Sequence, residues 1–185
     1  MEKPLPRSFY ARDAIHLAPA LIGKILLRRI GGRTRRARIV ETEAYIGEHD
    51  LACHASKGRT NRTEIMFGPP GHAYVYFIYG MHHMLNIVAA GEGDAQAVLI
   101  RAAEPLDGWD VNLTGPGRLA RGLELTRVHN GVDLTRGDLV LTDDPDAAKP
   151  PRVTRSKRIG VDYAGHWKHR LLRFHDANSR AVSKG

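Results

Sequence analysis

Short apolar blocks and alternating apolar and polar positions, separated by glycine, run through most of the chain and predict a mainly β protein. The predicted strands cover residues 24–30, 33–45, 73–78, 83–90 and 95–103, with two short ones around Ile159 and over 171–174. Gly31 and Gly32 fit a two-residue hairpin turn between the first two strands. The strands between 73 and 103 are joined by short turns, so they predict an antiparallel meander.

The helical signals are short and lie at both sides of this β pattern. We expect helices over 9–17 after an N-cap at Ser8, from Pro19 to a stop at Gly23, and from Pro116 to about Leu125. Residues 46–72 are rich in Gly, His, Arg and Pro and predict a long loop. Loops of that length in compact domains tend to be functional or disordered.

Length and composition narrow the class of protein. A chain of 185 residues with 42% hydrophobic and 26% charged residues predicts a single domain, 1–185, with frayed ends at about 1–7 and 178–185. No apolar run approaches the ~20 residues of a membrane helix, and no apolar leader follows Met1. The single cysteine, Cys53, excludes an internal disulfide and favours a reducing compartment. We therefore expect a cytoplasmic protein without a membrane partner.

The charge balance points to a polyanionic partner. Lys and Arg number 28 against 20 Asp and Glu, giving +8, and such an excess favours nucleic acid because neutralised phosphates release counterions. Six arginines surround the turn at 31–32, namely Arg28, Arg29, Arg33, Arg35, Arg36 and Arg38. A basic surface that serves only solubility is the alternative interpretation of the same charge.

Two carboxylates on one predicted strand are candidates for catalysis. Glu41, Glu43 and Tyr45 share one face of the strand 33–45, because side chains alternate along a strand. A partly desolvated carboxylate is a stronger base than a solvated one and could activate water. The alternative is that each glutamate pairs with an arginine of the nearby basic turn. We favour that alternative for Glu41, and leave both interpretations open for Glu43.

Tyrosines gather in the strand 73–78 and the turn after it. Tyr74 and Tyr76 share a strand face, and Tyr79 stands at a turn where Gly80 allows a sharp bend. In a basic protein such aromatic residues suggest stacking on bases, and an aromatic side chain at a hairpin tip suggests a wedge between base pairs. A tyrosine-rich core strand is the alternative.

Potential metal ligands cluster between residues 49 and 54. His49, Asp50, Cys53 and His54 lie close together in sequence, but their spacing does not give the two ligand pairs of a zinc site. We therefore predict no metal and no cofactor. A metal-dependent hydrolase built on Glu41, Glu43 and the histidines is a rival hypothesis, which activity in excess chelator would eliminate.

Several of these blocks together resemble one known family, the alkyladenine (3-methylpurine) DNA glycosylases. The resemblance runs in order from about Leu21 to Phe174 and rests on Arg38 to Gly47, Ala52-Cys-His54, Met66-Phe67, Gly71 to Met81, Leu85-Asn86, Leu99-Ile-Arg101, Glu104-Pro105, Gly115-Pro116 and Gly160-Val161. It implies a monofunctional glycosylase that starts base-excision repair by hydrolysing alkylated or deaminated purines from duplex DNA. One departure is the segment 106–114, which is shorter than its counterpart in the family and puts DNA contacts from that region in question.

The resemblance also implies roles for single residues. Glu43 is expected to be the general base and Arg101 to hold the attacking water. The base pocket is expected to consist of Tyr45, His54, Tyr76, Asn86 and Val161. Tyr79, with Met81 beside it, is expected to insert into the DNA. Contacts with the DNA backbone are assigned to Arg59, Arg62, Arg118 and Arg158.

We therefore expect an α+β fold, with a curved and mainly antiparallel sheet, short flanking helices and a protruding hairpin that intercalates into DNA. The expected partner is double-stranded DNA with damaged purines, and the expected state is a monomer in the cytoplasm, at the nucleoid if the source is bacterial. The alternative function is a non-catalytic nucleic-acid-binding module. Such a module explains the charge and the aromatic residues but gives Glu43 no role.

Overall fold

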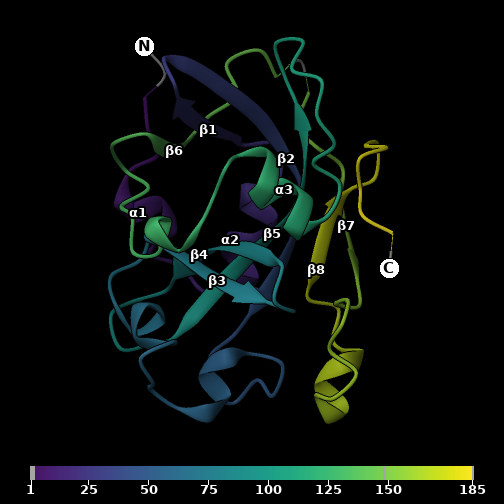
Figure 1. Cartoon of the computed structure of the whole chain (residues 1–185). Helices are drawn as coiled ribbons and strands as arrows, with labels where there is room; N and C mark the ends of the chain where they lie inside the picture. The colour runs from purple at the N-terminus through teal and green to yellow at the C-terminus, as the bar shows by residue number, and fades with distance from the viewer. Residues whose placement is uncertain (1–2, 148, 185) are drawn as a thin grey trace.

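The strands pair into one curled antiparallel sheet around the long central strand β2 (Figure 1). The computed structural model describes residues 3–147 and 149–184. Within them the strands are β1 (Ile25–Ile30), β2 (Arg33–Tyr45), β3 (Ala73–Ile78), β4 (His82–Ala89), β5 (Gln96–Pro105), β6 (Leu139–Thr142), β7 (Val153–Ser156) and β8 (Arg173–Asp176). The main order is β3-β4-β5-β2-β1-β6, and β8 pairs with both β2 and β7. The expected α+β fold with a curved antiparallel sheet is confirmed.

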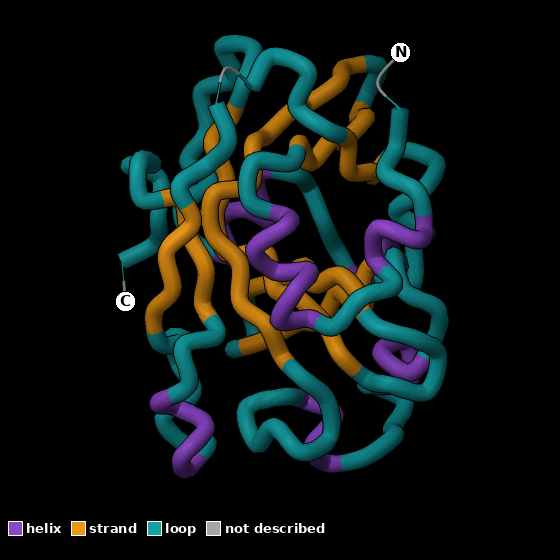
Figure 2. Tube along the Cα trace, turned by 180° about the vertical axis from the view of Figure 1, so that it is seen from behind, coloured by secondary structure: helices purple, strands orange, loops and turns teal. Residues whose placement is uncertain are grey.

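Short helices flank this sheet. They are α1 (Arg7–Tyr10), α2 (Ala14–Leu21) and α3 (Pro116–Gly122), with the 3-10 turns η1 (His54–Lys57), η2 (Glu64–Phe67), η3 (Arg127–His129) and η4 (Gly165–His169). Figure 2 shows α2 lying across the strands on the face seen from behind. Leu17 and Leu21 of α2 are fully buried there, and the hydroxyl of Thr42 on β2 donates a hydrogen bond to the carbonyl of Ala18 at 2.9 Å. One face of β2 is thus covered by α2.

The N-terminal helices differ from the prediction. The expected helix over 9–17 is two helices, because the chain breaks between Tyr10 and Ala14. The side chain of Gln96 accepts a hydrogen bond from the backbone N–H of Ala14 at 2.8 Å and so fixes the start of α2. Pro19 consequently lies inside α2, two residues before its end, and does not open a helix.

The pairing of β2 with β5 contains a β-bulge near Glu41. Glu41 lies opposite Ala102 while Thr42 lies opposite Ile100, so Arg101 is an extra residue on β5. Such a bulge redirects the side chain of the extra residue and bends the strand locally. The bulge therefore places Arg101 beside the carboxylates of β2.

The C-terminal third departs most from the sequence-based expectation. Residues 139–142 form the fully buried strand β6, which was not predicted. The strand expected around Ile159 lies earlier, at β7, and β8 begins two residues later than the expected 171–174. Within the predicted loop 46–72, the structure contains the short turns η1 and η2.

Both ends of the chain, as far as they are described, pack against the body of the protein. Leu5 is buried and its backbone N–H donates to the carbonyl of Leu141, and Ser183 is 7% exposed. These contacts differ from the fraying expected at 1–7 and 178–185, although Met1, Glu2 and Gly185 lie outside the described residues. Over residues 3–147 and 149–184, the helices are all too short or too polar to cross a bilayer.

Candidate active site

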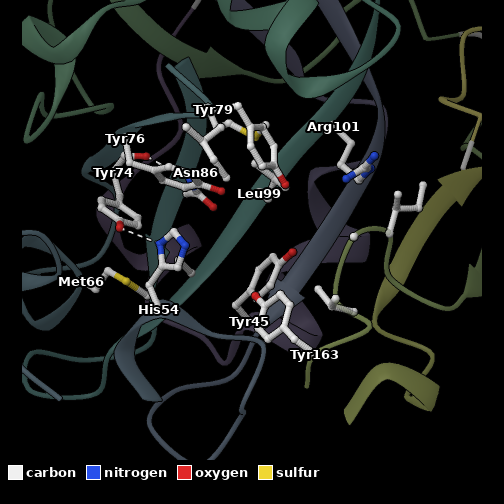
Figure 3. A pocket seen from close by; sticks show the side chains of 16 residues that line it. Tyr45, His54, Met66, Tyr74, Tyr76, Tyr79, Asn86, Leu99, Arg101 and Tyr163 are labelled. Carbon is white, nitrogen blue, oxygen red and sulfur yellow. Dashed lines mark hydrogen bonds between the residues drawn. The ribbon is translucent and has the colours of Figure 1, made fainter. Parts of the chain in front are cut away.

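A pocket with a volume of about 140 Å³ opens over β2, β3, β4 and β5 (Figure 3). Its walls include Tyr45 from β2, Tyr74 and Tyr76 from β3, Asn86 from β4, Leu99 and Arg101 from β5, His54 and Met66 from the segment 46–72, and Val161 and Tyr163 from the segment after β7. Side chains alternate along a strand, so Tyr45 points to the opposite face of β2 from Thr42, which contacts α2. The pocket therefore lies on the face of β2 that α2 does not cover. All five residues predicted for the base pocket line this one cavity.

Glu43 lies fully buried behind the pocket wall. Its Oε2 accepts a hydrogen bond from the Tyr45 hydroxyl at 2.8 Å, and its Oε1 accepts one from the backbone N–H of Ile159 at 2.8 Å. Burial raises the pKa of Glu43, while the nearby charge of Arg101 and the two hydrogen bonds act in the opposite direction. A carboxylate with a raised pKa is a better proton acceptor than a solvated one.

Arg101, like Tyr45, both lines the cavity and contacts Glu43. It lines the pocket, and its Nη1 lies 3.5 Å from Oε2 of Glu43. Its Nε donates a hydrogen bond to Oε1 of Glu41 at 3.1 Å, and Arg173 donates to the same oxygen at 2.6 Å. The expected ion pairing of Glu41 is confirmed, but its partners are Arg101 and Arg173 rather than arginines of the β1–β2 turn.

Arg158 does not occupy the place that the sequence suggested. Its side chain is 0% exposed and forms a bidentate ion pair with Asp50, at 2.6 and 2.9 Å, instead of facing DNA. Its guanidinium also lies 4.8 Å from the ring centre of Tyr45, a residue that lines the pocket. The assignment to the DNA backbone is therefore corrected: Arg158 is a structural residue that braces Tyr45.

The aromatic wall of the pocket comes from β3 and η1. The ring of His54 lies 4.6 Å from that of Tyr76, and its Nδ1 is hydrogen-bonded to the hydroxyl of Tyr74 at 2.9 Å (Figure 3). Burial, with the charges of Arg62 and Lys57, lowers the pKa of His54 to about 4. The imidazole is therefore neutral at pH 7 and can act as a neutral hydrogen-bond donor or acceptor.

Three further contributors to the site were missed from the sequence. Met66 and Tyr163 line the pocket, and the backbone of Ile159 binds Glu43. The tyrosine content and the position of Tyr163, two residues after Val161, are a local signal for that side chain. A backbone N–H leaves no signal in the sequence, so the role of Ile159 emerges only from the fold.

The turn between β3 and β4 exposes its side chains at the rim of the pocket. Tyr79 is 77% and Met81 69% exposed, and both Tyr79 and Gly80 have left-handed backbones, with φ of 54° and 67°. A bulky residue at positive φ is strained. Tyr79 also lines the pocket, so the turn presents an aromatic ring beside the entrance (Figure 3).

The other three arginines assigned to DNA are exposed. Arg59 is paired with Glu64 at 2.9 Å. The guanidinium of Arg62 lies 5.2 Å from the ring centre of Tyr76, at the edge of the pocket, and Arg118 of α3 donates to the carbonyl of Thr114. These three side chains remain accessible to a partner, unlike that of Arg158.

The arrangement combines a cavity walled by aromatic rings with a buried carboxylate and an adjacent guanidinium. It can hold a flat heteroaromatic ring between tyrosines and a neutral imidazole, and offers a base and a fixed positive charge next to it. Among the described residues, no three His, Cys, Asp or Glu side chains are grouped so that they could hold a metal ion.

Comparison with known proteins gives one consistent result. The family model described as methylpurine-DNA glycosylase (MPG) matches residues 8–180. Proteins named "Putative 3-methyladenine DNA glycosylase" are similar over almost their whole length. One from Myxococcus xanthus is 53% identical, covering 98% of this chain and 94% of that protein. One from Methanocella arvoryzae is 47% identical with coverages of 97% and 96%, and one from Legionella pneumophila 44% with 98% and 99%.

Proposed function

Because this chain belongs to the methylpurine-DNA glycosylase family, we propose that it is a monofunctional DNA glycosylase that hydrolyses methylated purines from duplex DNA. The observation that carries this proposal is the position of Glu43, a buried carboxylate with a raised pKa directly behind an aromatic pocket. The proposal extends to deaminated purines, such as hypoxanthine, because the tyrosine rings of the pocket can stack on a neutral purine as well as on a cationic one.

Base flipping is the first step of the proposed reaction, because a base inside the helical stack cannot reach a pocket of this kind. Tyr79, at the exposed turn, is proposed to fill the gap that the flipped nucleotide leaves, with Met81 beside it. The flipped purine would then stack on Tyr45 and Tyr76. A methylated, cationic purine strengthens this contact through cation–π attraction.

Hydrolysis is proposed to follow at the sugar carbon C1′. A water oxygen forms a bond to C1′ while the C1′–N bond breaks and its electron pair leaves with the purine. The sugar gains oxocarbenium character, which the negative charge of Glu43 stabilises, and the water proton passes to Glu43. Arg101 is proposed to hold the water, since it touches both the cavity and Glu43.

The proposed product is an abasic site with an intact DNA backbone. Nothing in this hydrolytic step requires a covalent bond between protein and sugar, which a lyase needs. A nick in the product that appears without heat or alkali treatment would contradict the monofunctional assignment.

The decisive experiment is the substitution Glu43→Gln, which keeps the size of the side chain but removes its basicity. We expect release of 3-methyladenine from methylated duplex DNA to fall by at least about 100-fold, since a general base contributes about that much or more. Binding to the same DNA is expected to persist. Single-turnover measurements with enzyme in excess and EDTA present, followed by heat or alkali treatment, give the rate.

Glu48→Gln is the matched control, because Glu48 is an exposed carboxylate on the segment that follows β2. Its rate is expected to equal that of the unmodified protein. Equal activity of both variants would refute the role of Glu43. DNA binding without any release by the unmodified protein would support the non-catalytic binding module instead, and loss of release in EDTA would support a metal-dependent hydrolase.

The extension to deaminated purines is tested with duplexes that carry one hypoxanthine, in the same single-turnover measurement.

A further inference from the structure

The C-terminal segment reaches the buried side of the candidate active site. Ser183 is 7% exposed, and its backbone N–H and hydroxyl donate hydrogen bonds to the two carboxylate oxygens of Glu41, at 2.6 and 2.8 Å. Glu41 is itself fully buried and lies two residues before Glu43 on the same strand. A residue near the end of the chain is thereby fixed to the strand that carries the proposed base.

The same serine also contacts Arg101. Its hydroxyl oxygen lies 3.4 Å from Nε and 3.3 Å from Nη2 of that guanidinium, and accepts hydrogen bonds from both. Arg101 therefore has Glu41 and Ser183 on one side, and Glu43, 3.5 Å from Nη1, on another. The guanidinium is a rigid planar fork, so contacts at Nε and Nη2 fix the direction of Nη1.

We propose that Ser183 is a positioning residue of the active site: together with Glu41, it fixes the guanidinium of Arg101 so that Nη1 lies against Glu43 at the pocket wall. This inference rests on the proposed function, since its consequence is measured on the glycosylase reaction. The hydrogen bonds of Ser183 within the described residues go to Glu41, Arg101 and Arg173, so it acts on Glu43 through Arg101.

Two features of the network favour this role over simple attachment of the chain end. Arg173 already binds Oε1 of Glu41 at 2.6 Å and the carbonyl of Ser183 at 3.0 Å, so the chain end has an anchor that does not involve Arg101. Among the described residues, the hydroxyl of Ser183 is the one hydrogen-bond acceptor of Nη2 of Arg101. Without that hydroxyl, the guanidinium loses the hydrogen bond at Nη2 and one of the two at Nε.

The position of Arg101 affects the protonation of Glu43. The charged and titratable groups around Glu43 are Arg101 from β5, Tyr45 and Glu41 from β2, Tyr76 from β3, Arg173 from β8 and Arg158 from the segment after β7. Arg101 is the nearest cation and lowers the pKa of Glu43, whereas Glu41 raises it. If Arg101 moves away from Glu43, the carboxylate needs a higher pH to lose its proton.

The test is Ser183→Ala, measured as the single-turnover release of 3-methyladenine from methylated duplex DNA across a range of pH. We expect the rate at neutral pH to fall about tenfold, which is the size of effect that a hydrogen bond to a charged group gives. The acid limb of the pH profile is expected to move to higher pH, and the affinity for the DNA to stay unchanged. Ser183→Thr, which keeps the hydroxyl, is expected to restore the rate and the profile.

Ser179→Ala is the matched control, because Ser179 lies on the same segment and its hydroxyl binds Glu104 instead of Glu41. The control is expected to leave both rate and profile unchanged, and thermal unfolding of each variant identifies the temperature at which all are folded. An acid limb that stays in place or moves to lower pH overturns the proposal, as does an equal rate loss in Ser179→Ala. These outcomes are independent of Glu43→Gln, which tests the glycosylase assignment itself.

Discussion

At the scale of single residues, the two glutamates of β2 show how neighbours decide the role of identical side chains. Both are fully buried. Glu41 is bound by two arginines and by Ser183, so its charge is balanced by strong partners. Among the described residues, Glu43 has one cation at ion-pair distance, Arg101 at 3.5 Å, together with a tyrosine hydroxyl and one backbone N–H. Of the two carboxylates, Glu43 is therefore the one with fewer charged partners, and burial raises its pKa.

His54 makes the stability of the protein depend on pH. Burial lowers the pKa of His54 to about 4 in the folded protein, against about 6.5 in the unfolded chain, so the unfolded state binds the extra proton as the pH falls. The contribution of His54 is fully present above pH 6.5 and is lost between about 6.5 and 4. Between pH 6.5 and pH 4, the free energy of unfolding is expected to fall by about 3 kcal/mol less in His54→Gln than in the unmodified protein.

Denaturant unfolding at several pH values measures this difference. His49→Gln, at an exposed position of the same segment, is the control for replacing a histidine by glutamine. Parallel curves for His54→Gln and the unmodified protein would show that the imidazole is not desolvated in solution.

At the scale of elements, the β3–β4 hairpin holds a strained residue at its tip. Tyr79 adopts a left-handed backbone with φ 54°, and its side chain is highly exposed at the rim of the pocket. A left-handed backbone costs a bulky residue roughly 1 kcal/mol or more, while asparagine tolerates it. An exposed tyrosine that costs stability at this position is consistent with the proposed insertion into DNA.

The substitution Tyr79→Asn separates stability from function. We expect the free energy of unfolding to rise by about 1 kcal/mol, because asparagine relieves the backbone strain. Release of methylated purines from duplex DNA is expected to fall, because the aromatic wedge is lost. Met81→Asn removes a neighbouring exposed side chain without relieving a left-handed backbone, so a gain in stability from that variant as well would argue against strain at Tyr79.

The elements also show what the sequence could predict and what it could not. The hairpin 25–45 and the meander 73–105 were predictable because alternation and glycine turns are local signals. Strand β6 was not, since its short run of three apolar residues followed by Thr142 has no periodicity, and its partner β1 is distant in the sequence. The pocket residues followed from the family resemblance. The bulge at Arg101 and the burial of Arg158 depend on long-range pairing, which no local pattern encodes.

At the scale of the whole molecule, only some of the arginines behind the net charge of +8 are exposed and free to contact a partner. Arg36 and Arg38, near the β1–β2 turn, pair with acidic side chains of the segment 104–146, and Arg158 is buried with Asp50. Arg62 and Arg118, in contrast, are exposed without a carboxylate at ion-pair distance among the described residues. Total charge alone therefore does not identify the surface that DNA would contact.

Salt dependence of DNA binding tests which arginines contact phosphate. Arg62→Ala and Arg118→Ala are each expected to reduce the slope of log affinity against log salt by about 0.9, the value for one phosphate contact. Arg33→Ala, at the exposed β1–β2 turn and at the opposite end of β2 from Glu43, is expected to leave the slope unchanged. An equal decrease for all three variants would indicate a diffuse interaction without a defined DNA-binding face.

The long-range contacts of Glu41 and Glu43 set the moment at which the protein can become active during its synthesis. Both carboxylates lie in the first quarter of the chain, whereas Ile159, Arg173 and Ser183, which bind them, lie near its end. A ribosome therefore releases β2 long before it releases the partners of these two side chains. A nascent chain, or one terminated early, carries the proposed base without the groups that hold it. The groups that hold the proposed base are therefore complete only once the ribosome has released the chain through Ser183.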